Sequence, residues 1–302
     1  MEGTQGIHSP RAGGLEYYRP RSVEEAIRLL TDLGEEAMLV GGATDVWVEM
    51  RSGKLTPKAL VSLRGVGDLR YLEPEGSALT IGAGTRHADV EDSEWVAGNL
   101  PALHQACSGV GSRQIRNVAT VGGNLCNAAP CADSAVGLLL YDAVAVTQGP
   151  AGSREIPLKD FFVAPGLTVL EHGEILVRVE VPDSGPRTYA GYWKHTRRRG
   201  IELPMLGVGA RITFSEDGET VEKSRIALGV AGPTPRRMEE AEAVMEGFPL
   251  TEERVLEAAR MAAYQAEVRD SFRGKAWYRR EMIRVLIPRV LRHAGALEEV
   301  AE

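Results

Sequence analysis

Two glycine-containing stretches dominate this sequence: residues 40–45, VGGATD, and residues 118–133, VATVGGNLCNAAPCAD. Each places a Gly-Gly pair beside a threonine, Thr44 in the first stretch and Thr120 in the second. Glycine lets the backbone approach a ligand closely and reach positive φ, and N–H groups exposed in such turns form a concavity that binds anions. Two converging glycine turns therefore suit a pyrophosphate, although either pair alone is also typical of an ordinary tight turn.

The elements before the first pair predict where it lies. Ser22 is a good N-cap with Glu25 three positions later, a capping box that opens an amphipathic helix. Gly34 can close this helix in a left-handed conformation. The apolar residues 37–40 then predict a strand, which ends in the glycine turn before a second helix from Val46.

The rest of the chain divides into two parts that differ in their order of predicted strands and helices. Short strands are predicted at residues 60–63, 78–83, 143–146 and 175–181, with helical periodicity at 87–110, broken near 99–101, and at 135–140. Beyond about residue 182, strands at 189–194, 206–214 and 225–230 precede helices at 236–246, 252–268 and 275–292. We expect an α+β protein with one domain at 1–180, split into two lobes near residue 70, and a second at 181–302.

Composition excludes several classes of protein. The net charge is −7, and a nucleic-acid binder would need a clustered basic face. No apolar stretch reaches the ~18 residues of a membrane span, and no apolar segment suggests a signal peptide. Three cysteines cannot supply the four thiolates of a standard iron–sulfur cluster, and their low, odd number favours a reduced, cytoplasmic chain in which they are structural. They are Cys107, Cys126 and Cys131.

Other site motifs are missing from the sequence. No P-loop and no G-x-G-x-x-G turn occurs, so neither a P-loop nor a Rossmann nucleotide site is supported. The histidines show no metal spacing, and neither an H-E-x-x-H motif nor a G-x-S-x-G elbow is present. We therefore expect no metal ligands and no hydrolase-type nucleophile in this chain.

Two single residues and one basic run have more than one interpretation. Asp133 could accept a hydrogen bond from a ligand hydroxyl or cap the helix predicted after it. Lys194 could reach an oxygen atom of a bound ligand or be a surface lysine on a strand. The three arginines at 197–199 could line a path for an anionic acceptor, contact a partner, or simply be solvated.

Together, the two glycine stretches resemble those of the FAD-binding (medium) subunits of the xanthine dehydrogenase and carbon monoxide dehydrogenase family of molybdenum hydroxylases. The resemblance covers nearly the whole chain, including GS at 111–112, QIRN at 114–117, the strand region 173–182 and IALGVAGPTPR at 226–236. It implies a fold like that of the vanillyl-alcohol oxidase (PCMH-type) flavoproteins, with FAD held between two α+β lobes. A smaller α+β C-terminal domain, with a three-stranded sheet plus helices, would follow.

The resemblance also implies positions for non-covalently bound FAD. The first motif would wrap the pyrophosphate, and the second would close on the same group and on the ribitol. Asp133 would bind a ribose or adenine-side hydroxyl, Val110 would lie near the flavin, and Leu176 and Lys194 would pack against or bond the flavin end. The motif residues are Leu39, Val40, Gly41, Gly42, Ala43, Thr44, Asp45 and Val46 in the first, and Thr120, Val121, Gly122, Gly123 and Asn124 in the second.

The implied function is electron transfer. Molybdopterin and [2Fe-2S] clusters would lie on separate large and small partner subunits, and this chain would pass electrons from the clusters through FAD to an external acceptor. We expect no catalytic side chain here, and an assembly that is a dimer of heterotrimers. The chain lacks the cysteine-rich loop of the branch that resembles 4-hydroxybenzoyl-CoA reductase.

Two alternatives are a stand-alone FAD-dependent oxidoreductase, in which His87 or His104 could carry a covalent flavin link, and a non-catalytic nucleotide-binding module. The first would need its own substrate pocket and base. The second is disfavoured because both glycine motifs are complete.

Overall fold

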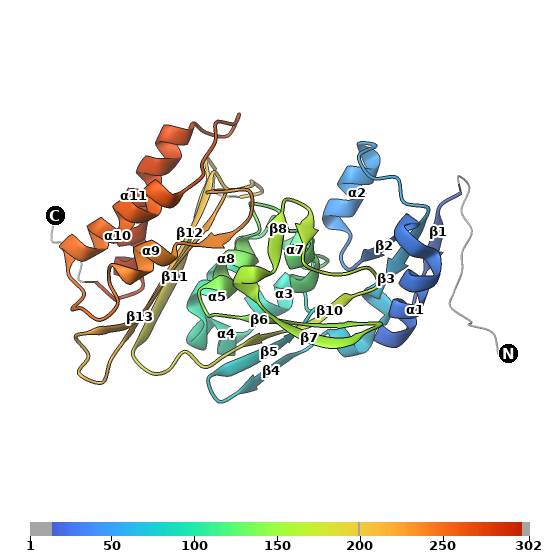
Figure 1. The fold of residues 1–302 in the computed structure, drawn as a ribbon, viewed down its shortest axis with the longest axis horizontal. Coiled ribbons are helices and arrows are strands. Elements are labelled where there is room, and N and C mark those ends of the chain that lie inside the picture. Colours follow the sequence, from blue (N-terminus) through green and yellow to red (C-terminus); the bar gives the residue numbers. More distant parts are fainter. Residues whose placement is uncertain (1–13, 199, 298–302) are drawn as a thin grey trace.

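A computed structural model describes residues 14–198 and 200–297, and Figure 1 shows three neighbouring groups of elements. The first group contains a parallel sheet of order β1-β3-β2. Its elements are β1 (Glu16–Tyr18), α1 (Val23–Leu33), β2 (Ala37–Val40), α2 (Thr44–Arg51) and β3 (Ala59–Ser62). Helix α1 begins as predicted, since Ser22 Oγ accepts from the Glu25 N–H at 3.2 Å, and it ends at Gly34 with φ 67°. The Glu25 carboxylate accepts from the N–H of Arg21 rather than from that of Ser22.

The second group is built on a five-stranded antiparallel sheet of order β4-β5-β10-β6-β7. Its strands are β4 (Leu72–Glu75), β5 (Ala78–Gly82), β6 (Val144–Gly149), β7 (Gly152–Pro157) and β10 (Ile175–Val181). A small hairpin, β8 (Phe162–Ala164) with β9 (Leu167–Thr168), lies beside it. The helices are α3 (His87–Glu91), α4 (Glu94–Asn99), α5 (Pro101–Ser108), α6 (Arg113–Arg116), α7 (Val121–Cys126) and α8 (Asp133–Leu139). Short 3-10 helices occur at Gly34–Glu36, Leu63–Gly65, Gly67–Leu69 and Leu158–Asp160.

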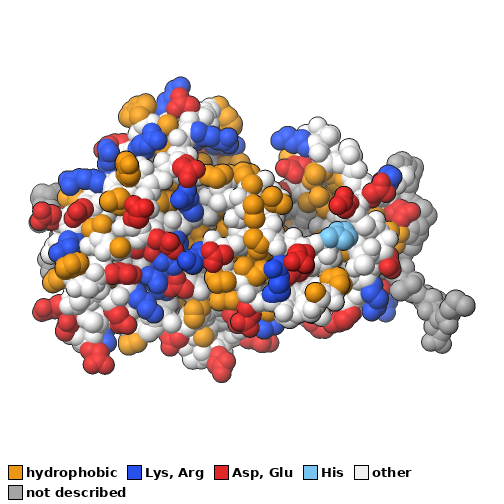
Figure 2. All heavy atoms as spheres, viewed as in Figure 1, with side chains coloured by type: hydrophobic (Ala, Val, Ile, Leu, Met, Phe, Trp, Pro, Cys, Tyr) orange, Lys and Arg blue, Asp and Glu red, His pale blue; other side chains and the backbone are white. Residues whose placement is uncertain are grey.

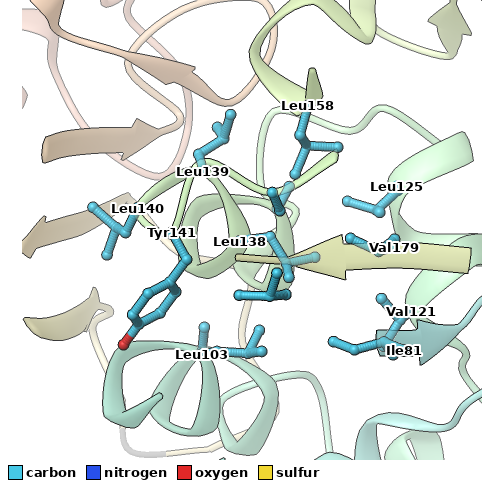
Figure 3. Close-up of a cluster of buried hydrophobic side chains, with 14 of the residues drawn as sticks. Ile81, Leu103, Val121, Leu125, Leu138, Leu139, Leu140, Tyr141, Leu158 and Val179 are labelled. Atoms are coloured by element: carbon cyan, nitrogen blue, oxygen red, sulfur yellow. The ribbon is translucent and has the colours of Figure 1, made fainter. Parts of the chain in front are cut away.

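The main core lies between this sheet and its helices, as Figure 3 shows. Leu138 projects from α8 towards Leu103 of α5 and Val179 of β10, and all three side chains are fully buried. Tyr141 is also buried, and its hydroxyl accepts from the N–H of Ala102 at 3.2 Å. This core fixes α7, which lies within the second glycine stretch, and α8, which begins at the last residue of that stretch.

The C-terminal group packs helices on one face of an antiparallel sheet of order β11-β12-β13-β14 (Figure 1). Its elements are β11 (Thr188–His195), β12 (Leu206–Phe214), β13 (Val221–Gly229), β14 (Arg236–Arg237), α9 (Glu239–Ala243), α10 (Glu252–Gln265) and α11 (Ala276–His293). The expectation of three strands is wrong, because Arg236 and Arg237 pair with β13 as a fourth strand. The predicted helix at 236–246 therefore starts later, at Glu239.

A carboxylate after α8 joins the second group to the C-terminal sheet. Asp142 has φ 53° and accepts from Arg225 Nε at 2.8 Å, Arg237 Nη1 at 2.5 Å and Arg211 Nη2 at 3.2 Å. Burial opposes its charge, but the three arginines outweigh burial and hold the pKa of Asp142 below its usual value. These contacts between Asp142 and the three arginines fix the C-terminal sheet against α8. Strand β11 of that sheet carries the candidate site residue Lys194.

None of the helices within the described ranges has the length and apolar content that crossing a membrane requires.

Candidate functional site

The first glycine motif forms a run of free backbone donors. Gly41 and Gly42 follow β2, Ala43 adopts the left-handed conformation with φ 58° and ψ 15°, and α2 begins at Thr44. The first bond of the helix is from Trp47 N–H to Ala43 O at 3.0 Å. No acceptor among residues 14–198 and 200–297 takes the N–H groups of residues 42–46. Such a run at a helix N-terminus is an anion-binding arrangement.

The two glycine motifs touch each other. A Cβ atom on Gly41 would lie 2.7 Å from Thr120 Oγ1, and one on Gly42 would lie 2.3 Å from the carbonyl oxygen of Val118. Both distances are far below van der Waals contact. Glycine is therefore required here for the approach of the second motif, a reason distinct from the ligand contact that the sequence suggested.

The second motif is a helix start rather than the predicted turn. Thr120 is the N-cap of α7, and its hydroxyl accepts from the Gly123 N–H at 3.1 Å. The N–H groups of Val121 and Gly122 donate to Thr85 O and Ala83 O, each at 2.9 Å. These donors are used inside the protein, so only the first motif offers a run of free N–H groups.

Two adjoining cavities lie along these motifs. The large cavity, about 750 Å³, and the small cavity, about 550 Å³, share a waist formed by Leu39, Gly41, Thr120, Gly123 and Cys126. In Figure 2 a notch between the lobe that carries α2 and the central part of the molecule marks this region of the surface.

The structure brings nearly all of the predicted site residues to these cavities. The large cavity is also lined by Val40, Gly42, Ala43, Thr44, Asp45, Val46, Val110, Asn124, Asp133 and Lys194. The small cavity is also lined by Gly122 and Leu176. Val121 lines neither cavity, because its side chain is fully buried in the main core.

A buried ion pair lies in the wall of the large cavity. Lys194 Nζ donates to Asp133 Oδ2 at 2.7 Å and to Gly109 O at 2.8 Å, and the Tyr192 hydroxyl donates to Asp133 Oδ1 at 2.5 Å. The side chains of Lys194 and Asp133 are 15% and 4% exposed. Burial raises the pKa of Asp133 above its ordinary value, although the Lys194 ammonium and the Tyr192 hydroxyl act against it.

This pair corrects several interpretations. Asp133 is the first residue of α8, whose N-cap Ala132 makes no side-chain cap, so the capping alternative is wrong. Lys194 is largely buried, so the surface-lysine alternative is also wrong. Asp133, expected on the adenine side of FAD, and Lys194, expected at the flavin end, are in direct contact. Leu176 lines the small cavity and Lys194 the large one.

Sequence reasoning missed the residues that hold the wall near Val110. Arg116 Nη1 donates to Val110 O at 3.1 Å, while its Nε and Nη2 bind the Glu91 carboxylate at 2.7 and 2.8 Å. Arg116 belongs to the QIRN segment, but nothing in one sequence shows that Glu91, in α3, is its partner. The small cavity is also lined by Arg64, Arg86 and Glu174. No local sequence pattern predicts that these three residues belong to the site.

The remaining candidates from the sequence are two histidines and the cysteines. His87 is fully buried and His104 Nε2 contacts Glu91 O at 2.9 Å; neither lines a cavity, which disfavours either as a flavin attachment point. Cys126 and Cys131 are free thiols in the large-cavity wall, and burial raises the pKa of Cys126 to about 12. No group of three or more potential ligand side chains that could hold a metal ion occurs in the described part of the chain.

The basic run at 197–199 is engaged locally where the structure describes it. Arg197 Nη2 binds Glu202 Oε1 at 3.0 Å, and Arg198 Nη2 donates to Ile201 O at 2.5 Å. Both arginine side chains are exposed. Arg199 lies outside the described residues.

Comparison with known proteins identifies the class. Residues 12–184 match the family model described as the FAD binding domain in molybdopterin dehydrogenase, and residues 191–294 match the CO dehydrogenase flavoprotein C-terminal domain. The chain therefore belongs to the FAD-binding subunits of the molybdenum-containing dehydrogenases, which confirms the resemblance, the α+β fold with its C-terminal domain, and FAD as the cofactor of this family.

Two relatives and one solved structure match over nearly their whole lengths. A putative xanthine dehydrogenase FAD-binding subunit of Escherichia coli is 32% identical over 93% of this chain and 96% of its own. The carbon monoxide dehydrogenase medium chain of Hydrogenophaga pseudoflava is also 32% identical, over 93% of this chain and 97% of its own. A chain of the solved carbon monoxide dehydrogenase of that organism superposes with a TM-score of 0.89 and 33% identity, covering 95% of this chain and 99% of that chain.

Proposed function

We propose that this chain binds FAD non-covalently and passes electrons from the [2Fe-2S] clusters of a small partner subunit to an external acceptor, within an enzyme whose molybdopterin lies on a large subunit. The observation that carries the FAD site is the run of free N–H groups at residues 42–46 beside two joined cavities. Bound FAD would supply the redox chemistry, because it can exchange one or two electrons. The protein supplies binding, orientation and electrostatics.

The residues present fit a dinucleotide. A pyrophosphate at the waist would receive the free N–H groups of the first motif, whose left-handed Ala43 turns them to one side. The two cavities would then take the two halves of the molecule. We assign the isoalloxazine to the large cavity, which holds Val110, Asp133 and Lys194, and the adenosine to the small one, where Leu39, Val66 and Leu176 offer apolar contacts.

Lys194 has a defined task in this arrangement. An ammonium group has three N–H donors, and Asp133 and Gly109 take two of them. The third remains for an oxygen atom of the flavin. A cation held beside the ring favours negative charge on it and so favours its reduced form. Asp133 and Tyr192 position the ammonium without themselves contacting the reacting atoms.

The partners follow from the names of the relatives. The carbon monoxide dehydrogenase relative is a medium chain, and this implies a large and a small chain beside it. We propose the same three-subunit arrangement here, doubled into a dimer of heterotrimers, in the cytoplasm. We also propose that residues 1–180 form the FAD-binding domain, as two lobes that meet near residue 70, and that 181–302 form a separate domain.

Isolation of the assembled enzyme tests this function. An affinity-tagged copy of the chain, expressed in its own source cells, should co-purify with two other chains, and the complex should contain iron, molybdenum and FAD. A substrate of the complex should bleach the flavin absorbance. A chain that purifies alone with FAD and oxidises its own substrate would favour the stand-alone oxidoreductase. Nucleotide binding without any flavin reduction would favour the binding module.

A further inference from the structure

A buried histidine contacts the second glycine stretch from behind the large cavity. His87 is fully buried at the start of α3, with Nδ1 3.1 Å from Ala119 O and Nε2 3.3 Å from Ser134 Oγ. In the structure Ser134 Oγ donates to Oδ1 of Asn124 at 2.7 Å, and Asn124 lines the large cavity. A continuous line of polar contacts therefore runs from His87 to the cavity.

The first contact fixes where the proton of the ring lies. A carbonyl oxygen can only accept a hydrogen bond, so Nδ1 of His87 must carry hydrogen to donate to Ala119 O. The opposite neutral form would set the Nδ1 lone pair against that carbonyl oxygen. Nδ1–H is therefore present whether the ring is neutral or charged, and the state of Nε2 remains to be decided.

The surroundings of the His87 ring favour its neutral form over the charged imidazolium. No carboxylate among the described residues hydrogen-bonds to His87. Burial lowers the pKa of His87 to about 4, the Ala119 carbonyl opposes this, and the positive charge of Arg116 adds to it. The neutral ring with hydrogen on Nδ1 leaves Nε2 as a bare acceptor.

Only one arrangement of hydrogen atoms satisfies the neutral ring and both remaining contacts, and it reverses the bond in which Ser134 donates to Asn124 Oδ1. Nε2 of His87 accepts the single hydroxyl hydrogen of Ser134, so Ser134 Oγ must accept in its contact with Asn124. The donor there is the amide nitrogen of Asn124. Because the nitrogen and oxygen of an amide occupy equivalent places, a half-turn of the Asn124 amide satisfies this pattern at unchanged distances.

We propose that His87 is a positioning residue which, through Ser134, turns the carbonyl oxygen of Asn124 towards the large cavity. The ligand must then present a hydrogen-bond donor at this point. Because pyrophosphate oxygens only accept, Asn124 contacts a ribityl hydroxyl or the flavin N3–H instead. This identification of the ligand rests on the proposed function, whereas the orientation of the amide does not.

Nuclear magnetic resonance of the full chain tests the orientation without any ligand. With 15N-labelled histidine, long-range 1H–15N spectra should show His87 as neutral, with hydrogen on Nδ1, between pH 6 and 8. In Asn124→Asp, both carboxylate oxygens accept, so Ser134 must donate to Asp and the ring must donate to Ser134. The pKa of His87 should rise in this variant. A ring that carries hydrogen on Nε2 in the wild-type chain would overturn the inference.

Binding of FAD analogues tests the donor requirement. Four analogues each lack one donor: 3-methyl-FAD and the 2′-, 3′- and 4′-deoxyribityl forms. One of them should bind up to about tenfold more weakly than FAD to the wild-type chain, the worth of one neutral hydrogen bond. The same analogue should lose little in Asn124→Leu, which removes the acceptor at similar volume. Equal losses in both chains for all four analogues would overturn the donor requirement.

The two measurements also separate this inference from the proposed function. If the wild-type chain binds none of the flavins, the proposed function and the donor requirement fail together. The protonation of His87 still decides the orientation of Asn124 in that case, because it is read from the free protein.

Discussion

Lys194 Nζ lies 2.7 Å from Asp133 Oδ2, although 61 residues separate them in the sequence. The contact joins β11 of the C-terminal sheet to the first residue of α8, so the wall of the large cavity is formed from two parts of the fold. Removal of one partner of a buried pair leaves the other charge without compensation. The pair is therefore a sensitive point for stability as well as for the site.

We expect Lys194→Met to lower the free energy of unfolding by about 3–5 kcal/mol at pH 8, because the buried Asp133 carboxylate loses its cation. Burial already raises the pKa of Asp133, and loss of Lys194 raises it further. A carboxyl group whose pKa is higher in the folded than in the unfolded protein contributes stability at low pH. This contribution is lost as the pH rises from the unfolded-state pKa to the folded-state pKa. The cost of the substitution should therefore be smaller at pH 5 than at pH 8, as measured by urea unfolding.

The matched control is Lys159→Met, whose pair with Glu239 has both side chains about half exposed, 47% and 60%. Its cost should be much smaller than that of Lys194→Met, because solvent screens an exposed pair. An equal cost for Lys194→Met at both pH values would contradict the assignment of the effect to the Asp133 charge.

Gly42→Ala should reduce both stability and FAD retention. Its Cβ would lie 2.3 Å from Val118 O, so the two glycine motifs would have to separate. We expect a loss of about 1–3 kcal/mol from overpacking, measured by thermal or urea unfolding, and a fall in bound flavin. Gly98→Ala is the control, since a Cβ atom there meets nothing within 4 Å. Normal flavin content in Gly42→Ala would show that the contact between the motifs is dispensable.

Asp142→Ala should loosen the C-terminal sheet, because three arginines lose their shared acceptor. A loss of about 3 kcal/mol is expected at pH 7. Since the folded-state pKa of Asp142 is lowered, its contribution is present above its unfolded pKa and is lost as pH falls through the lowered value. The stabilities of wild type and variant should therefore converge only in strong acid. A constant difference down to pH 2 would contradict this account.

Thiol labelling should report occupancy of the large cavity. Cys131 is partly exposed in its wall, whereas Cys107 is fully buried. Burial raises the pKa of both thiols, so modification by N-ethylmaleimide at pH 8 should be slow. We expect bound FAD to slow it further. Cys126 lies in the same wall, but burial raises the pKa of its thiol to about 12, so Cys131→Ser should remove the FAD-sensitive part. Equal rates with and without FAD would place the flavin elsewhere.

The predictable part of the fold was set by local chemistry. The cap at Ser22, the helix end at Gly34 and the strand Ile175–Val181 all follow from neighbouring residues, and the structure has each of them. The fourth strand of the C-terminal sheet did not follow, because Arg236 and Arg237 make only a two-residue ladder with β13. Such a short pairing leaves no periodic signal.

The site was predictable as a location, but its internal contacts were not. The glycine stretches indicated the convergence, yet Gly122 and Gly123 suggested a turn because glycine is a poor helix former. The structure places them in α7, where position 122 needs glycine because a Cβ there would lie 2.7 Å from Ala83. Likewise Asp133 had a plausible local role as a cap, and its true partners lie 59 and 61 residues away.

FAD binding by the purified chain tests the central claim most directly. The flavin-free chain should be mixed with FAD, passed through a desalting column and examined by absorbance, with chromatography of the cofactor released by heat. The account predicts retained flavin bands, intact FAD equimolar with the chain, and little retention by Gly42→Ala. Absence of bound flavin in a wild-type chain that is folded by circular dichroism would contradict the claim that the free N–H groups at residues 42–46 and the two cavities form a complete FAD site.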